Sequence, residues 1–334
     1  MAGLEDELTR IAAETGFSGV VRVDRPDSPP LERAFGLADR AHGITMTTDT
    51  RLGMASGSKA FTALAVMSLV DEGVLTLSTT ARSLLGTDLP LIGDDVTVEH
   101  LLGHRSGIGD YLDDDADPGE YLLTAPVHQL TTTEAFVPLL DGHETLFPAG
   151  ERFSYCNGGF VVLALLAERA SGTSYQDLVR RRVLGPAGMT RTEFLRGDDL
   201  PGDAAVGYVE VDGVERSNVL HLPVIATGDG GVHTTVADVH LFWAALDAGR
   251  IVAAETVATM VAPRDTGPDE TPRYGLGFWV DSVDDDRVQL EGADAGVSFR
   301  SSHHRVTGTT WTVVSNTSDG TWPVARAVAA ALAG

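Results

Sequence analysis

The stretch Met54-Ala55-Ser56-Gly57-Ser58-Lys59 decides the fold, together with the apolar run that follows it over residues 60–70. A helix that is apolar on all sides belongs in a core. The run ends at residues 71–73, where a glycine suits the C-terminal cap. The sequence therefore predicts a buried helix that carries Ser56 and Lys59 at its N-terminus. Side chains three residues apart share one helix face, so we expect the hydroxyl and the amine to meet.

Lys59 is the only lysine among the 334 residues, whereas arginine occurs 23 times. Arginine cannot give up its proton in a protein, but a buried lysine can, and it can then act as a base. A serine hydroxyl is a poor nucleophile until an adjacent base takes its proton. The N–H groups of a helix N-terminus also favour an oxyanion. Ser56 and Lys59 thus indicate an activated nucleophile, although a helix cap followed by a surface lysine would give the same pattern.

Bulk properties limit what the chain can do. Its 334 residues, 43% hydrophobic and 22% charged, are enough for a large core and for two domains. The net charge of −24 repels the phosphates of nucleic acids, and no segment has the length of a transmembrane span. The N-terminus lacks the basic and apolar regions of a signal peptide. We therefore expect a cytoplasmic protein without a nucleic-acid or membrane partner, whose oligomeric state stays open.

Candidate metal ligands are sparse. Cys156 is the only cysteine, which excludes an internal disulfide and a cysteine-based zinc site. His100 and His104 have the spacing of two ligands on one helix face, but no H-E-x-x-H motif accompanies them. The acidic stretch 113–119 lacks the regular oxygen spacing of a calcium loop, which favours a solvated loop. The sequence therefore predicts no metal site.

Hydrophobic periodicity divides the chain into a helical middle and two ends that contain strands. The main helical patterns are 4–15, 96–102, 134–140, 160–170, 235–246 and 253–261, and a last helix begins near 323. The strand-like segments are 17–23, 31–37, 206–211, 274–280, 287–291, 297–301 and 309–315. This order predicts an α+β fold whose sheet is built from both chain ends, with an all-α insertion. We assign residues 1–80 and 203–334 to a sheet domain and 81–202 to a mainly helical domain, with the active site in the cleft between them.

A second motif, Tyr155-Cys156-Asn157, lies in a loop just before an apolar helix. A tyrosine and an amide two residues apart can both point into a cleft. Tyrosine can relay a proton if a nearby ammonium lowers its pKa, and asparagine can hydrogen-bond a substrate carbonyl or the lysine. Alone this triplet is compatible with an ordinary loop. Together with the Ser-x-x-Lys motif about a hundred residues upstream, it indicates a catalytic site.

With these motifs the chain resembles the serine β-lactamase and penicillin-binding-protein-like family, in the class C branch that includes esterases and D-amino-acid peptidases. The resemblance runs along nearly the whole chain. The matching stretches are 35–39 (FGLAD), 55–63 (ASGSKAFTA), 101–107 (LLGHRSG), 147–157 (FPAGERFSYCN), 184–192 (LGPAGMTRT), 230–238 (GGVHTTVAD) and 274–278 (YGLGF). No glutamate-containing class A loop is found, which favours the branch with the Tyr-x-Asn motif.

The resemblance implies an antiparallel sheet flanked by helices and acyl transfer through a covalent ester of Ser56. Lys59 and Tyr155 would share the proton taken from Ser56, and Tyr155 would pass it to the leaving group. Asn157 would orient the substrate. The backbone N–H groups of Ser56 and of a strand residue near Ala295 would form the oxyanion hole. The family implies neither a metal nor an organic cofactor, and its substrates are small esters or amides.

The third motif of the family is where this chain departs from the pattern. Relatives carry lysine or histidine, then a small residue and glycine, on the strand beside the site. Counting back from Phe299 through the stretch 291–299 (EGADAGVSF) puts Gly292 where the cation is expected and Asp294 two positions on. That cation helps to bind the carboxylate of a β-lactam or a peptide. With Asp294 beside the site instead, we expect a neutral or cationic ester or amide and little activity on β-lactams, unless Arg300 or His303 supplies the charge.

Other functions stay open at this point. The altered third motif would also fit a non-catalytic binding or sensor module that keeps the fold without turnover. The position of Cys156 inside the Tyr-x-Asn motif makes it an alternative nucleophile, although a small packing residue fits it better. Within the family, hydrolase, acyltransferase and D-amino-acid peptidase share the acyl-enzyme, so the sequence does not separate them.

Overall fold

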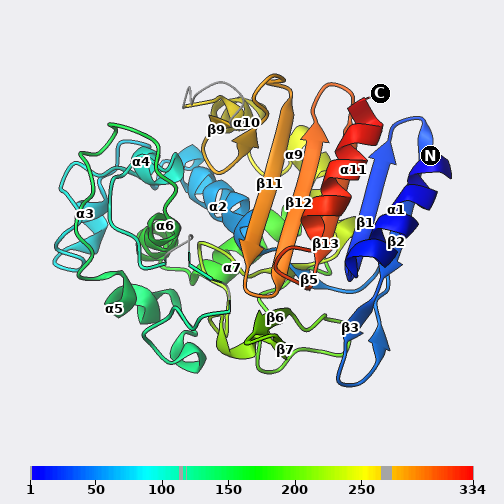
Figure 1. The fold of residues 1–334 in the computed structure, drawn as a ribbon. Coiled ribbons are helices and arrows are strands. Elements are labelled where there is room, and N and C mark those ends of the chain that lie inside the picture. The colour runs from blue at the N-terminus through cyan, green and yellow to red at the C-terminus, as the bar shows by residue number, and fades with distance from the viewer. Residues whose placement is uncertain (1, 113–115, 118, 265–272, 334) are drawn as a thin grey trace.

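A seven-stranded antiparallel sheet forms one side of the computed structural model, which describes residues 2–112, 116–117, 119–264 and 273–333. Its strand order is β2-β1-β13-β12-β11-β10-β9, so the N-terminal hairpin pairs with strands from the end of the chain (Figure 1). The strands are β1 (Gly19–Arg25), β2 (Ser28–Phe35), β9 (Arg273–Tyr274), β10 (Trp279–Val280), β11 (Arg287–Asp294), β12 (Val297–His304) and β13 (Thr309–Ser315). The α+β prediction and the assembly from both ends are confirmed.

The remaining strands are short and pair two by two. They are β3 (Leu37–Asp39) with β4 (Ile44–Thr45), β5 (Leu52–Gly53) with β8 (His233–Thr234), and β6 (Tyr208–Val211) with β7 (Val214–Ser217). The helices are α1 (Ala2–Thr15), α2 (Lys59–Asp71), α3 (Ala81–Leu85), α4 (Val98–Leu102), α5 (Val137–Leu140), α6 (Asn157–Ser171), α7 (Tyr175–Val179), α8 (Gly185–Ala187), α9 (Val236–Asp247), α10 (Ala254–Val261) and α11 (Thr321–Ala333). Short 3₁₀ turns include η1 (Ala55–Ser58).

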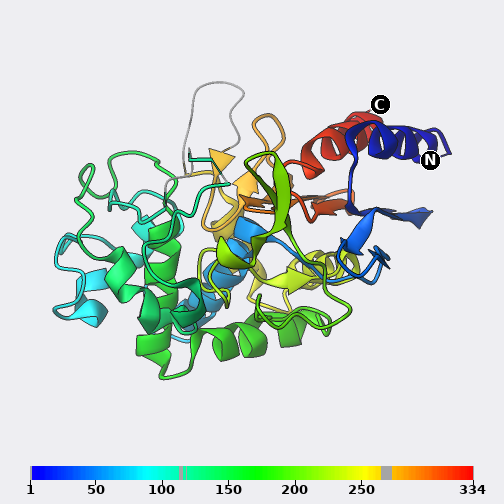
Figure 2. The same ribbon diagram turned by 60° about the horizontal axis from the view of Figure 1, so that its bottom comes forward.

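The two faces of the sheet are covered by different helices. Successive side chains of a strand point to opposite faces. On β1 and β13, Val21 and Val313 therefore pack into a core with α1 and α11, whereas Val20 and Val314 join the main core with α2, α6 and α9. Figure 2 shows α1 and α11 together above the sheet, α9 below it, and the helices of the middle of the chain to its left. The site described below is built on the second face.

Helix α2 is buried on all sides, as its uniformly apolar sequence predicts. It packs against α6 and lies between the sheet and the helices of the middle of the chain (Figure 1). Gly73 follows the helix at φ 74°, the left-handed conformation that a C-terminal cap needs. The assignment of 1–80 and 203–334 to one domain and 81–202 to another stays a prediction, because a single apolar core continues from the sheet through α2 into α6.

Two of the expected segments, 274–280 and 113–119, do not match a single described element. The strand expected over 274–280 is two short strands, β9 and β10, separated at Gly277, which adopts φ 88°. A side chain there would meet the Cβ atom of Ala63 on α2 at 2.3 Å, so the chain bends where it touches the buried helix. The acidic loop expected over 113–119 includes residues 113–115 and 118, which lie outside the described part of the chain. Among the described residues, no helix is both long and apolar enough to cross a bilayer.

Candidate active site

Ser56 lies in the turn η1, immediately before the buried helix α2. The residue before it, Ala55, has φ 42°, in the left-handed region that costs a non-glycine residue roughly 1–2 kcal/mol. Ala55 is buried, and the N–H of Gly57 donates to the carbonyl of Met54 at 2.8 Å, so this strained turn is held in place by the core. Strain of this kind is found mostly at functional sites. The turn therefore fixes Ser56 at the N-terminus of α2.

Lys59 lies one turn further on and is buried, with 2% of its surface exposed. Its Nζ atom is 2.8 Å from Ser56 Oγ, 2.8 Å from Asn157 Oδ1 and 2.6 Å from the carbonyl oxygen of Asp229. The meeting of the hydroxyl and the amine that the spacing predicts is therefore present. The contact with Asp229 was not predictable from side-chain patterns, because every residue carries a carbonyl.

Asn157 is the first residue of α6, and Asp110 fixes it there. One carboxylate oxygen of Asp110 accepts from the N–H of Asn157 at 2.5 Å and the other from that of Gly158 at 2.8 Å. A carboxylate at a helix N-terminus satisfies N–H groups that have no partner within the helix. Asp110 therefore orients the residue whose amide reaches Lys59. Asp110 could not be found from the sequence, because no spacing motif links it to Asn157, 47 positions away.

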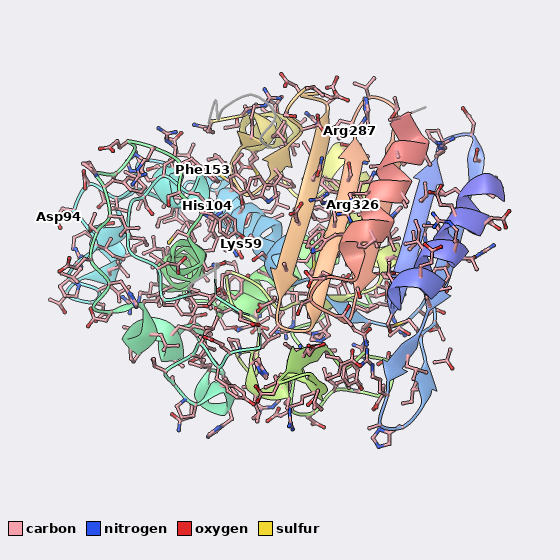
Figure 3. The ribbon with its side chains drawn as sticks, viewed as in Figure 1. Lys59, Asp94, His104, Phe153, Arg287 and Arg326 are labelled. Atoms are coloured by element: carbon pink, nitrogen blue, oxygen red, sulfur yellow. The ribbon has the colours of Figure 1, made fainter. Side chains whose placement is uncertain are left out.

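Tyr155 lies beside the amine and the hydroxyl. Its ring centre is 5.0 Å from Lys59 Nζ, and it shares a small cavity with Ser56 and Lys59. The imidazole of His104 stacks on the same ring at 4.3 Å. Figure 3 shows His104 next to Phe153 on the side of Lys59 that faces α4 and α6. Burial, and then the charge of Lys59, hold the pKa of His104 well below its usual value, so this histidine is neutral where it packs against Tyr155.

Cys156 is an unsuitable nucleophile. Its thiol is buried, and its Sγ atom accepts from the N–H of Gly159 at 3.3 Å as the N-cap of α6. Burial, and then the charge of Asp110, raise the pKa of the thiol well above its usual value. A reactive cysteine needs an accessible thiolate, so these observations favour the structural interpretation of Cys156.

The strand β11 brings the altered third motif against the nucleophile. A Cβ atom at Gly292 would lie 2.5 Å from Met54 O and 2.7 Å from Ser56 N. No side chain fits there without moving the backbone, so position 292 of this chain cannot hold a cationic side chain. Gly292 instead allows the strand to touch η1.

Asp294 and Ala295, the two other residues of this stretch expected at the substrate, have different surroundings. Asp294 lines a large cavity together with Ser56, and its role in substrate binding stays a prediction. Ala295 lies in the turn after β11, and its N–H donates to Asp294 Oδ1 at 2.8 Å. That contact differs from the role expected for an N–H group near Ala295, because an oxyanion donor must point at the substrate.

Arg300 and His303, which could have replaced the missing cation, both have partners elsewhere. Arg300 pairs with Glu291 across the sheet. His303 lies under the sheet, where its ring nitrogens contact Asp247 and Thr310, each at 2.7 Å. The site therefore has no counterpart of the expected cation among the residues that the structure describes around Ser56.

Ser56 lies between two cavities. The larger one, about 1150 Å³ including its part open to solvent, is lined by Ser56, Asn157, Asp229 and Asp294, among other residues. The smaller one, about 200 Å³, is lined by Ser56, Lys59 and Tyr155. A nucleophile between two compartments can receive the two halves of an ester or amide on opposite sides. Within the described ranges, no group of three histidine, cysteine, aspartate or glutamate residues could hold a metal ion.

Several known proteins are similar to this chain in sequence. The beta-lactamase family model matches residues 4–333. Penicillin-binding protein 4* of Bacillus subtilis is 30% identical over 279 residues, which cover 79% of this chain and 59% of that protein. A D-aminopeptidase of Brucella anthropi is 30% identical over 268 residues, 79% of this chain and 49% of that protein.

A solved structure is similar over almost its whole length. The penicillin-binding protein from Bacillus halodurans superimposes with a TM-score of 0.91 at 33% identity, covering 97% of this chain and 99% of that one. By contrast, the chain spans only about half to three fifths of the two relatives named above. The match to the family model and to these relatives shows that the chain belongs to the beta-lactamase family.

Proposed function

We propose that this protein is a serine hydrolase that acts on a small ester or amide through an acyl-Ser56 intermediate. The observation that carries the proposal is the 2.8 Å contact between Lys59 Nζ and Ser56 Oγ at a buried position. Lys59 Nζ donates to Asn157 Oδ1 and to the carbonyl of Asp229. In the proposed reactive form Lys59 has given up its charge, and the lone pair of the neutral amine accepts the proton of Ser56.

The proposed reaction has two halves, the formation and the hydrolysis of the acyl-enzyme, and Lys59 and Tyr155 transfer protons in both. Ser56 Oγ attacks the substrate carbonyl carbon while its proton passes to Lys59. Tyr155 gives its hydroxyl proton to the leaving oxygen or nitrogen as the bond to the carbonyl carbon breaks, and Lys59 restores that proton. Water then attacks the acyl-enzyme and loses a proton to the same pair of residues. They give that proton to Ser56 Oγ as its bond to the acyl carbon breaks, which releases the carboxylic acid and free Ser56. Asn157 orients the substrate.

The oxyanion of each tetrahedral intermediate needs two N–H donors. We propose the N–H groups of Ser56 and Ala293 for this role. Ala293 follows Gly292, the residue that lies against Ser56 N, and it lines the large cavity. This replaces Ala295, whose N–H is already donated to Asp294.

The test of this function is covalent labelling with a fluorophosphonate, followed by mass spectrometry of the intact protein and of its peptides. We expect one label, on Ser56, and none in Ser56→Ala. Ser58→Ala is the matched control, because Ser58 lies in the same turn and donates to the carbonyl of Ala55, and this variant should keep the label. An unlabelled wild-type protein would favour a binding or sensor module, and a label on Cys156 would contradict the assignment of the nucleophile.

We further expect poor turnover of β-lactams, which carry a carboxylate. Asp294 and Asp229 line the large cavity, and Glu291 takes up the charge of Arg300. Nitrocefin should therefore be hydrolysed with a kcat/KM far below about 10⁵ M⁻¹s⁻¹, a value inside the ordinary enzyme range, while p-nitrophenyl esters are turned over readily. A kcat/KM for nitrocefin near that value would mean that the substrate carboxylate finds a cation elsewhere.

A D-amino-acid peptidase is the second candidate of the same family, in its class C-like branch. A relative at 30% identity is named a D-aminopeptidase. An acyltransferase would use the same intermediate, with another nucleophile in place of water. Product analysis with and without added alcohol separates hydrolysis from transfer.

A further inference from the structure

The larger cavity is the compartment for the acyl half of the substrate, if the proposed roles hold. Tyr155 gives its proton to the leaving group, so the leaving group lies on the side of Tyr155, where the cavity measures only about 200 Å³. The acyl group then points the other way, past Asn157, into the cavity of about 1150 Å³. Side chains at the Ser56 end of that cavity would contact the substrate atoms next to the carbonyl carbon.

Asp229 is a charged residue that lines the cavity beside Ser56. Its own carbonyl accepts from Lys59 Nζ at 2.6 Å, and the next residue, Gly230, would bring a Cβ atom within 3.4 Å of Ser56 N. Its carboxylate is fixed by Tyr111, whose hydroxyl donates to Oδ2 at 2.5 Å. Both side chains line the large cavity. No part of the mechanism proposed above uses either of them.

The surroundings favour a cation at this place. The part of the chain that the structure describes contributes no lysine or arginine to the lining of the large cavity, whereas Asp294 adds a second carboxylate. The pKa of His233, another lining residue, is lowered to about 4 by burial and by Arg51, so this histidine is neutral at pH 7. Burial raises the pKa of Asp229 itself, and a bound cation would offset that cost of ionisation.

We infer that Asp229, held by Tyr111, receives the ammonium of an α-amino group on the acyl half of the substrate. The α-nitrogen is two bonds from the carbonyl carbon, which matches a carboxylate beside the nucleophile rather than at the far end of the cavity. The substrates are then aminoacyl esters, aminoacyl amides or peptides with a free amino terminus. This inference rests on the proposed function and names the substrate class of the same site.

Alanine p-nitroanilide and its N-acetyl derivative, each as the D and the L form, test the inference. The measured quantity is the ratio of kcat/KM for the free-amino substrate to that for the acetylated one, in which general damage to Ser56 cancels. We expect wild-type protein to prefer the free amine, and Asp229→Asn to lower the ratio about 10- to 100-fold, the worth of a hydrogen bond to a charged group. Asp94→Asn is the matched control, since Asp94 is exposed and lies far from the site (Figure 3).

Tyr111→Phe provides a second measurement that a purely structural role would not produce. Burial, and to a smaller extent the charge of Asp110, raise the pKa of Asp229, whereas the charge of Lys59 and the hydroxyl of Tyr111 lower it. Without the hydroxyl the pKa of Asp229 rises. As the pH is lowered, the carboxylate of the variant is therefore protonated earlier, and the preference for the free amine is lost at a higher pH than in wild type.

The outcomes are separable. A wild-type protein that prefers the acetylated substrate, or an Asp229→Asn ratio equal to that of wild type, overturns the inference and leaves the acyl-Ser56 chemistry in place. Failure of Ser56 to take the fluorophosphonate label overturns the proposed function and the inference with it.

Discussion

Replacing Lys59 by arginine lowers kcat for p-nitrophenyl ester hydrolysis about 10³- to 10⁴-fold, nearly as far as Ser56→Ala. Arginine keeps the positive charge but cannot accept a proton at any accessible pH, so Ser56 loses its base. The larger guanidinium must also fit a buried position where Asn157 Oδ1 and the carbonyl of Asp229 surround a single nitrogen. Steady-state kinetics with a panel of esters measures the loss.

The exposed Arg326 on α11 supplies the control for this exchange. Arg326→Lys makes the reverse substitution far from the cleft and should leave kcat unchanged (Figure 3). Thermal unfolding of both variants separates a chemical loss from a loss of fold. If Lys59→Arg kept a kcat within tenfold of wild type, Lys59 would be removed from the mechanism. A factor of ten corresponds to only about 1.4 kcal/mol in the activation barrier.

Much of the site follows from sequence because its parts are local. Ser56 and Lys59 are one helical turn apart, and the apolar run behind them requires burial, so their contact depends on no other segment. The antiparallel sheet from both chain ends is likewise indicated by the order of strands and helices and by the family resemblance. These features agree with the structure because each has a side-chain pattern of its own.

The residues that sequence analysis missed share a different property. Asp229 reaches Lys59 through a backbone carbonyl, and Asp110 holds Asn157 through backbone N–H groups. Every residue has these groups, so no pattern of residue types marks the contacts. They depend on how α6, α2 and the loop before β8 pack, which is a property of the whole fold. The carboxylate of Asp229 beside the nucleophile therefore became visible only in the structure.

The contact made by the third motif could not be predicted from the sequence for a related reason. Strand periodicity shows which residues of β11 share a face, but not which of them touches η1. Counting from Phe299 put residue 292 at the cation position, whereas Gly292 is paired with Phe299 and lies against the backbone of Ser56. Close approach of two backbones requires a glycine, and this requirement identifies the position better than a count of residues.

Gly292→Ala follows directly from this contact and should lower kcat about 10²- to 10³-fold, the usual loss when one oxyanion donor is removed. The added methyl group would lie 2.5 Å from Met54 O, 2.7 Å from Ser56 N and 2.8 Å from Gly57 N. All three are backbone atoms, so no side chain can turn aside and β11 must separate from η1. The N–H groups of Ser56 and Ala293, which we propose as the two donors, then no longer point at one oxygen.

KM should change much less than kcat in Gly292→Ala, because the donors act mainly on the charge that develops in the transition state. Overpacking of this kind also costs roughly 1–3 kcal/mol of stability, which a thermal melt measures separately. Gly202→Ala is the matched control, since a Cβ atom there has no neighbour within 4 Å. If Gly292→Ala were destabilised but kept the wild-type kcat, the contact between β11 and η1 would serve the fold alone, and the second oxyanion donor would have to come from another segment.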